Sequence, residues 1–119
     1  MKSIGEVASV FNVSVHTLRY YEKEAILFPQ RNHNGERIYD ETQIKWLRFV
    51  LKLKETQMPI AQIKEYTKYV KQGEKTTLER LKLLENHQQT IQQQMENLHA
   101  TNEMLEKKIS VYKDYLNTV

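Results

Sequence analysis

The chain has 119 residues, 39% of them hydrophobic and 28% charged, which suits one domain or one small domain with a helical extension. It contains no cysteine, so disulfides, thiolate metal sites and thiol redox sensing are excluded. No apolar run approaches the roughly 20 residues of a membrane span, and the N-terminus lacks the apolar core and cleavage site of a signal peptide. We therefore expect a cytoplasmic protein with no membrane partner.

Positive charge is concentrated in the N-terminal part of the chain. Residues 1–72 hold 12 Lys and Arg against 8 Asp and Glu, whereas residues 73–119 hold 6 against 7. An anionic partner should therefore bind the N-terminal part.

The first 24 residues predict two short helices joined by a tight turn. Apolar residues at 4, 7, 8 and 11 indicate an amphipathic helix that Ser3 can cap and that Asn12, which tolerates the left-handed conformation, can end. Ser14 is a good N-cap for a second helix that continues to about Glu24. Together these helices form a helix-turn-helix unit.

A projecting hairpin and two further helices follow. Asn34-Gly35 is a strong signal for a type I′ hairpin turn, which needs positive φ at both central residues. Asp40 caps a helix over about 41–56, with Gln43 as its capping-box partner. Pro59 suits the start of another helix that ends at Gly73. Residues 1–73 are thus predicted to form a winged helix-turn-helix domain.

Residues 74–119 are predicted to form a long dimerising coiled-coil helix, so the fold class is mainly α with a small β-hairpin wing. The segment after Gly73 contains no Gly or Pro, and with residue 81 at heptad position a, nine of eleven a and d positions are apolar. A helix cannot bury such a stripe alone, so a second copy is the simplest partner. The predicted dimerisation residues are Leu81, Leu84, Ile91, Met95, Leu98, Leu105, Ile109, Tyr112 and Leu116. His87 and His99 fall beside this stripe and are expected to be solvated.

The two adjacent tyrosines of the second helix separate by helical phase. Tyr21 falls on the side that packs on the first helix, whereas Tyr20 falls with His16 and Lys23 on the opposite side, flanked by Thr17 and Arg19. Such a face matches the requirements of DNA recognition, although a merely solvated face is an alternative. The hairpin favours DNA binding, because Arg31, Arg37 and Tyr39 would lie on it and a basic wing can grip the backbone beside the major groove.

Over about residues 2–70 the chain resembles the N-terminal domain of the MerR family of transcription regulators, through SIGEVASVFNVSVHTLRYYEKEAIL and then GERIYDETQIKWLRFVLKLKETQMPIAQIKEY. The resemblance implies a homodimer with an antiparallel coiled coil. It also implies binding to inverted repeats between the −35 and −10 promoter elements, and a distortion of the spacer that lets RNA polymerase engage both. Carried over residue by residue, the DNA contacts would be Thr17, Arg19 and Tyr20 on the helix, with Arg37 and Tyr39 on the wing. His16 and Arg31 are added from geometry and charge.

The chain departs from the family pattern at several positions. The family often has glycine where this chain has Asn12, Ala25 and Gln57, and an aromatic residue before the wing arginine where this chain has Glu36. The run IKWLRFVLKLKETQMPI is most similar to the branch that responds to aldehydes and other electrophiles. Some members of that branch carry a cysteine where this chain has Lys52, which we expect to be solvated or to face DNA.

Two other kinds of protein, an adaptor and an enzyme, match the sequence less well than a regulator does. A coiled-coil adaptor that binds another protein through its head would not need both the basic wing and the Arg19/Tyr20 face. An enzyme has little support, because no nucleophile, base and oxyanion donor can be assembled and no glycine-rich phosphate loop is present. The histidines do not pair at metal-ligand spacing, so no metal or other cofactor is expected.

Overall fold

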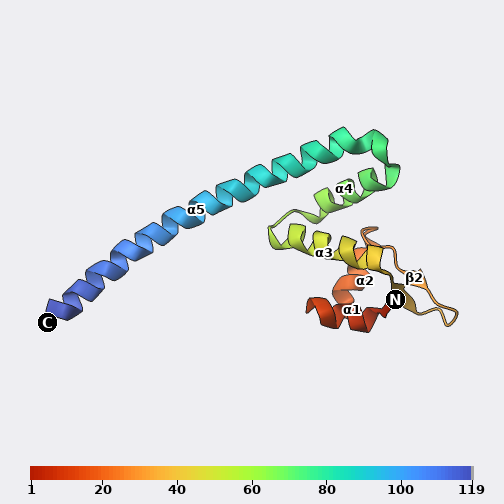
Figure 1. The fold of residues 1–119 in the computed structure, drawn as a ribbon, viewed down its shortest axis with the longest axis horizontal. Helices are drawn as coiled ribbons and strands as arrows, with labels where there is room; N and C mark the ends of the chain where they lie inside the picture. The colour runs from red at the N-terminus through yellow and green to blue at the C-terminus, as the bar shows by residue number, and fades with distance from the viewer. Residues whose placement is uncertain (119) are drawn as a thin grey trace. The chain divides into compact units, whose positions relative to one another are not determined.

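The computed structural model describes residues 1–118. The chain divides by contacts into two compact units, Met1–Leu83 and Leu84–Val119. The helices are α1 (Ile4–Phe11), α2 (Val15–Lys23), α3 (Glu41–Glu55), α4 (Ile60–Gln72), the 3-10 helix η1 (Glu74–Thr76) and α5 (Thr77–Thr118), and the strands are β1 (Lys2–Ser3), β2 (Gln30–Arg31) and β3 (Arg37–Tyr39) (Figure 1). The predicted mainly helical class with a small sheet is confirmed.

The helix-turn-helix forms where local capping signals place it. Ser3 and Glu6 form a reciprocal capping box at the start of α1, and Ser14 Oγ accepts a hydrogen bond from the Thr17 amide at the start of α2. Asn12 ends α1 in the left-handed conformation, at φ 54° and ψ 44°. These caps confirm the predicted start and end of α1 and the predicted start of α2.

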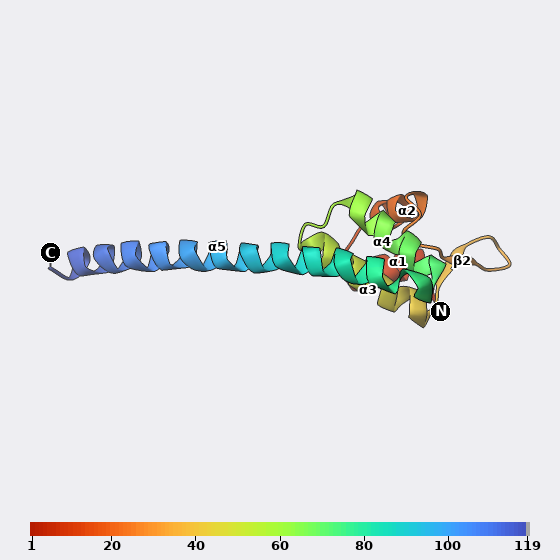
Figure 2. The same ribbon diagram turned by 90° about the horizontal axis from the view of Figure 1, so that it is seen from above.

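The wing is part of a three-stranded antiparallel sheet in the order β1-β3-β2. The two-residue strand β1 was not predicted, because two residues show no alternation. The expected type I′ turn is wrong: of Asn34 and Gly35, only Gly35 has positive φ. The loop instead has three residues, closed by a bond from the Asn32 amide to the Glu36 carbonyl, while Asn32 Oδ1 accepts from the Asn34 and Glu36 amides. The loop extends beyond the helices of its unit (Figure 2).

Helices α3 and α4 complete the first unit. Asp40 caps α3 as predicted, but the Gln43 side chain donates to the Phe28 carbonyl and no capping-box return bond is present. Trp46 Nε1 donates to the Ile26 carbonyl over 2.8 Å, which ties α3 to the segment after α2. The buried core draws on α1, α2, β3, α3, α4 and the loops between them. Its fully buried large side chains are Tyr39, Leu18, Ile26, Leu27, Leu47, Met58, Ile63, Val7 and Val50.

Within residues 1–118, three non-glycine residues adopt positive φ, and all three stand where the family often has glycine. They are Asn12, Ala25 and Gln57, with φ of 54°, 60° and 72°. Ala25 follows α2 and Gln57 follows α3, so each ends a helix at a tight turn. An L side chain in this region costs about 1–2 kcal/mol, least for asparagine. Ala25 and Gln57 therefore carry backbone strain that glycine would relieve.

Helix α5 is 42 residues long and exposes most of its predicted stripe. Leu84 and Ile91 are half-buried, whereas Met95, Leu98, Leu105, Ile109, Tyr112 and Leu116 are exposed, as is Leu81. His87 is only 7% exposed, so the expectation that it is solvated is wrong, while His99 is exposed. The predicted domain boundary lies at Gly73, where α4 ends, while the division by contacts falls ten residues later, because Leu83 packs against the core.

Among residues 1–118, no helix is long and apolar enough to cross a membrane. The same residues hold no group of three or more His, Asp or Glu side chains that could bind a metal ion.

Candidate nucleic-acid interface

Helix α2 presents two faces, as its phase predicts. Leu18 and Tyr21 are buried, at 0% and 4% exposure, whereas Tyr20 is 41% exposed. The centres of the two tyrosine rings lie 6.0 Å apart and their planes meet at 49°, so Tyr20 packs beside Tyr21 and is still partly exposed. His16 and Arg19 are exposed beside Tyr20, and Thr17 is half-buried. The predicted split between a core tyrosine and an outward tyrosine is confirmed.

The N-terminus of α2 adds donors to this face. Thr17 Oγ1 and Ser14 Oγ lie 2.9 Å apart, and Ser14 Oγ caps the Thr17 amide. Thr17 is thus held in one orientation beside the first turn. Helix N-termini carry partial positive charge and unpaired amides, which favour a phosphate. The face can therefore offer hydroxyl, guanidinium and amide donors to an anionic backbone.

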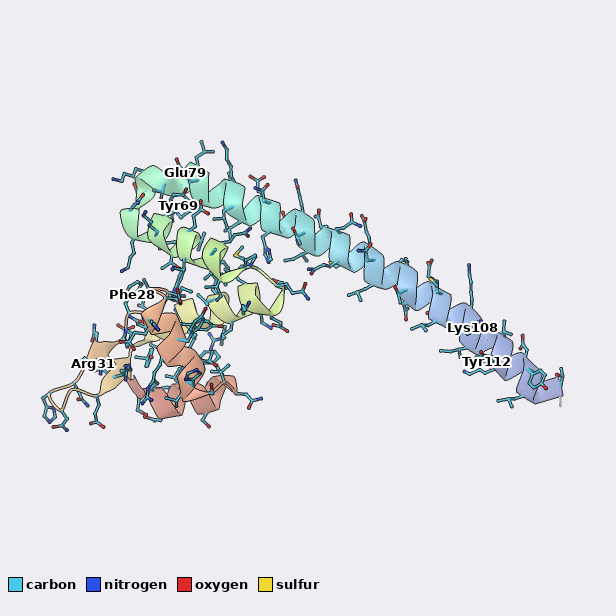
Figure 3. All side chains as sticks on the ribbon, turned by 180° about the vertical axis from the view of Figure 1, so that it is seen from behind. Phe28, Arg31, Tyr69, Glu79, Lys108 and Tyr112 are labelled. Atoms are coloured by element: carbon cyan, nitrogen blue, oxygen red, sulfur yellow. The ribbon has the colours of Figure 1, made fainter. Side chains whose placement is uncertain are left out.

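The carboxylate of Glu22 joins both wing arginines to α2. Its Oε2 accepts from Arg37 Nε over 2.5 Å, and its Oε1 accepts from an Arg31 guanidinium nitrogen over 3.4 Å. Arg31 also donates to the Gly35 carbonyl over 2.9 Å, which fixes the wing loop (labelled in Figure 3). The Glu22 and Arg37 side chains are about a quarter exposed, while that of Arg31 is about half exposed. Glu22 thus orients the wing and neutralises part of its charge.

Tyr39 does not occupy the place predicted for it. Its side chain is fully buried, so the expectation of a direct DNA contact is wrong. Strand alternation puts Tyr39 on the same face of β3 as Arg37, and that face turns toward Glu22 and the core. Burial raises the pKa of the Tyr39 phenol, and the charge of Glu22 raises it further. Its hydroxyl has no hydrogen-bond partner within residues 1–118.

Charged side chains outside the predicted set also lie on the two helices α2 and α4 of this unit. Glu22 and the exposed Lys23 lie on α2, while Lys64 and Lys68 lie on α4. Lys64 pairs with Glu24 over 2.9 Å. The spacing of lysines at 64, 68 and 71 marks one face of a helix and could have signalled a basic surface. The pairing of Glu22 with the wing had no local signal. Lys52 is exposed and pairs with Glu55 over 3.1 Å.

The second unit offers a different kind of surface. The exposed a and d positions of α5 are joined near its C-terminal end by exposed Met104, Val111 and Tyr115, which widen the stripe. Lys108 lies over the Tyr112 ring at 5.9 Å (Figure 3). A stripe this long exposes more apolar surface than a solvated helix normally keeps. Together, the fold and the face of α2 define a winged helix-turn-helix protein of the kind that binds duplex DNA.

Comparisons with known proteins give the family. The model described as "MerR HTH family regulatory protein" matches residues 2–70, and "MerR, DNA binding" matches residues 44–108. HTH-type transcriptional regulator AdhR of Bacillus subtilis is 33% identical over 90 residues, which are 75% of this chain and 64% of AdhR. An HTH-type transcriptional regulator of Haemophilus influenzae is 32% identical over 110 residues, which are 91% of this chain and 81% of that one.

Solved structures agree with these matches. HiNmlR, described as a MerR family regulator lacking the sensor domain and bound to promoter DNA, has a TM-score of 0.87 at 30% identity, covering 94% of this chain and 90% of its own. A MerR family regulator from Bacillus thuringiensis has a TM-score of 0.83 at 34% identity, covering 92% and 96%. The chain belongs to the MerR family of DNA-binding transcription regulators. It spans slightly less than two thirds of AdhR.

Proposed function

We propose that two copies of this chain associate through α5 and bind an inverted repeat in promoter DNA, where they distort the −35/−10 spacer so that RNA polymerase engages both elements. The observation that carries the proposal is the exposed face of Arg19 and Tyr20 on α2, next to a wing that Glu22 holds in place. Such a face and wing can contact base edges and the neighbouring phosphates together.

The dimer is supported by the exposed stripe of α5. Leu98, Leu105 and Ile109 are each at least half exposed in the single chain, so a partner helix would remove their apolar surface from water. A two-fold dimer carries two identical heads, and two heads match a palindromic site. Similarity to HiNmlR, which is bound to promoter DNA, supports the same type of target for this chain.

The test begins with mapping of bound sites across the genome of the source organism. We expect inverted repeats inside promoters whose spacers exceed the usual length. Transcription in vitro from one such promoter should rise when the protein is added, and shortening the spacer to the usual length should remove that dependence. Binding outside promoters, or activation that ignores spacer length, would contradict the distortion mechanism. DNA affinity without salt dependence would contradict the interface itself.

A further inference from the structure

A hollow of about 250 Å³ lies at the root of the wing, between the first two turns of α3 and the end of α4. Its walls include Phe28, Asp40, Trp46, Val70 and Lys71. Phe28 lies two residues before β2, and Asp40 directly follows β3, so the two chain segments that carry the wing both line the hollow. The hollow is separate from the exposed face of α2 and from the wing arginines.

Most polar groups around this hollow are already bonded within the protein. Asp40 Oδ1 accepts from the Gln43 amide, the Gln43 side chain donates to the Phe28 carbonyl, and Trp46 Nε1 donates to the Ile26 carbonyl. The Trp46 ring stacks on Tyr66 at 5.9 Å and 7°, which fixes its plane. The surface that remains is aromatic and aliphatic and is formed before any ligand arrives.

Two lysines of α4 give the site a preferred charge. Lys71 Nζ lies 3.0 Å from the centre of the Phe28 ring, and both residues also line a second hollow of about 430 Å³. The charged residues on the other walls of that second hollow are Lys64, Lys68, Glu24 and Glu65. Lys64 is paired with Glu24. Neither Lys68 nor Lys71 has an ion-pair partner within residues 1–118. Lys71 thus stands beside the apolar hollow, and Lys68 lines the neighbouring hollow (Figure 3 labels Phe28, which lines both).

We propose that the hollow binds a small planar aromatic anion. The ring system would lie against Phe28, Trp46 and Val70, and its carboxylate would meet Lys71, with Lys68 one helical turn away. An aromatic body contributes apolar burial and stacking, and the carboxylate supplies the charge that the lysines lack. A cationic ligand is disfavoured, because Lys71 lines the hollow with no ion pair within residues 1–118, while Asp40 Oδ1 already accepts from the Gln43 amide.

The position of this site gives it a consequence for the wing. A ligand that touches both Phe28 and Asp40 would hold together the two segments that enter and leave the wing. Binding would then favour one wing position over others, provided that the two positions differ in their contacts with the ligand. This consequence rests on the proposed DNA-binding function, whereas ligand binding itself does not.

The experiment uses the full-length chain without DNA and three probes of one shape: 1-naphthoate, neutral 1-naphthalenemethanol and cationic 1-naphthylmethylamine. Calorimetric titration gives each affinity, and Trp46, the one tryptophan of the chain, reports on the hollow by its fluorescence. We expect 1-naphthoate to saturate with a dissociation constant of about 1 mM or tighter. The neutral probe should bind about threefold to tenfold more weakly, and the cationic probe more weakly still.

Variants locate the site. Lys71→Gln should weaken 1-naphthoate binding by about threefold to tenfold and leave the neutral probe unchanged. Val70→Phe should fill the hollow and abolish binding of both 1-naphthoate and the neutral probe. Lys113→Gln, a lysine exposed on α5, is the matched control and should change nothing. If Val70→Phe fails to fold, the probe series and Lys71→Gln still decide.

Several results would overturn the proposal. They are a failure of 1-naphthoate binding to saturate, an equal loss of 1-naphthoate affinity in Lys71→Gln and Lys113→Gln, or tighter binding of the cationic probe than of the other two. The proposal would also be overturned if the lysines serve DNA phosphates instead. In that case Lys68→Gln and Lys71→Gln would lower DNA affinity and its salt dependence, while 1-naphthoate binding would stay unchanged. A failure of DNA binding would contradict the proposed function alone, because the titrations contain no DNA.

Discussion

Glu22→Gln is the substitution that most directly tests how the wing is held. The carboxylate of Glu22 accepts from Arg37 over 2.5 Å and from Arg31 over 3.4 Å. Glutamine keeps the shape of the side chain and one acceptor oxygen but removes the charge. Arg37, whose side chain is only 23% exposed, would then face a neutral partner in a poorly solvated place.

The size of the effect follows from exposure and geometry. A hydrogen bond to a charged group contributes about 1.5–3 kcal/mol, and the retained neutral acceptor keeps part of it, so the Arg37 contact should lose about 1 kcal/mol. The Arg31 contact is longer and about half exposed, so it should lose about 0.5 kcal/mol or less. Unfolding should therefore become easier by about 1–1.5 kcal/mol, and each kcal/mol lowers the midpoint of a domain of this size by about 4–8 °C.

Although Glu22→Gln should lower stability, it should raise the affinity for non-specific DNA. Loss of one negative charge frees a wing arginine for a phosphate, which should steepen the dependence of log affinity on log salt by about 0.9. Preference for the operator should fall, because the wing is no longer fixed against α2. Fluorescence anisotropy with operator and scrambled duplexes, each across a salt series, measures both quantities.

Glu36→Gln is the matched control for charge. Glu36 lies on the wing and is exposed, and its carboxylate accepts from the Asn32 side chain with no ion pair within residues 1–118. The Glu36→Gln substitution removes one negative charge, as Glu22→Gln does, but it leaves the contacts of Arg31 and Arg37 with Glu22 in place. Equal changes in Glu22→Gln and Glu36→Gln would show that only net charge matters. An unchanged melting midpoint in Glu22→Gln would refute the role of Glu22 in holding the wing.

Three further predictions test the turn after α2, the α5 stripe and the tyrosine pair. Ala25→Gly should raise the free energy of unfolding by about 0.5–1 kcal/mol, because φ is 60° there; a urea midpoint that does not rise contradicts this. Leu98→Asp should remove about 1.5–3 kcal/mol of stabilisation from apolar burial in each copy, so the dimer should dissociate in a sedimentation experiment. Ala100→Asp, on the opposite side of α5, is the control and should leave the dimer intact. A Leu98→Asp variant that still sediments as a dimer would refute the heptad register. Tyr20→Phe should keep the melting midpoint and weaken operator binding up to about tenfold, whereas Tyr21→Ala should cost about 3–5 kcal/mol of stability; the reverse outcome in melting and binding curves would refute the assigned faces.

Features that depend on nearby residues were predictable. Ser3, Ser14 and Asp40 cap the helices as their side chains and spacing indicate, and Gly73 ends α4. The phase of α2 separated Tyr20 from its neighbour without any knowledge of the rest of the chain. Each of these signals acts within about one helical turn, so it can be read from a short window.

The tertiary structure decided the parts that depend on distant partners. Glu22 meets Arg37 across 15 positions, and Lys64 meets Glu24 across 40. Tyr39 shares a strand face with Arg37, but only packing shows that this face turns inward and buries the phenol. The hairpin turn also departed from the Asn-Gly signal, because Asn32 bonds across the loop and leaves a single positive φ at residue 35.

The sequence by itself thus determined the helices, their caps, the two faces of α2 and the heptad stripe of α5, because periodicity and capping are local properties of the chain. Only the tertiary structure decided that Glu22 neutralises part of the charge of the wing, that Tyr39 belongs to the core and that Phe28, Trp46 and Lys71 line a hollow. The reason is that burial and ion pairing are set by which segments the fold brings together, and that choice is made by the whole core.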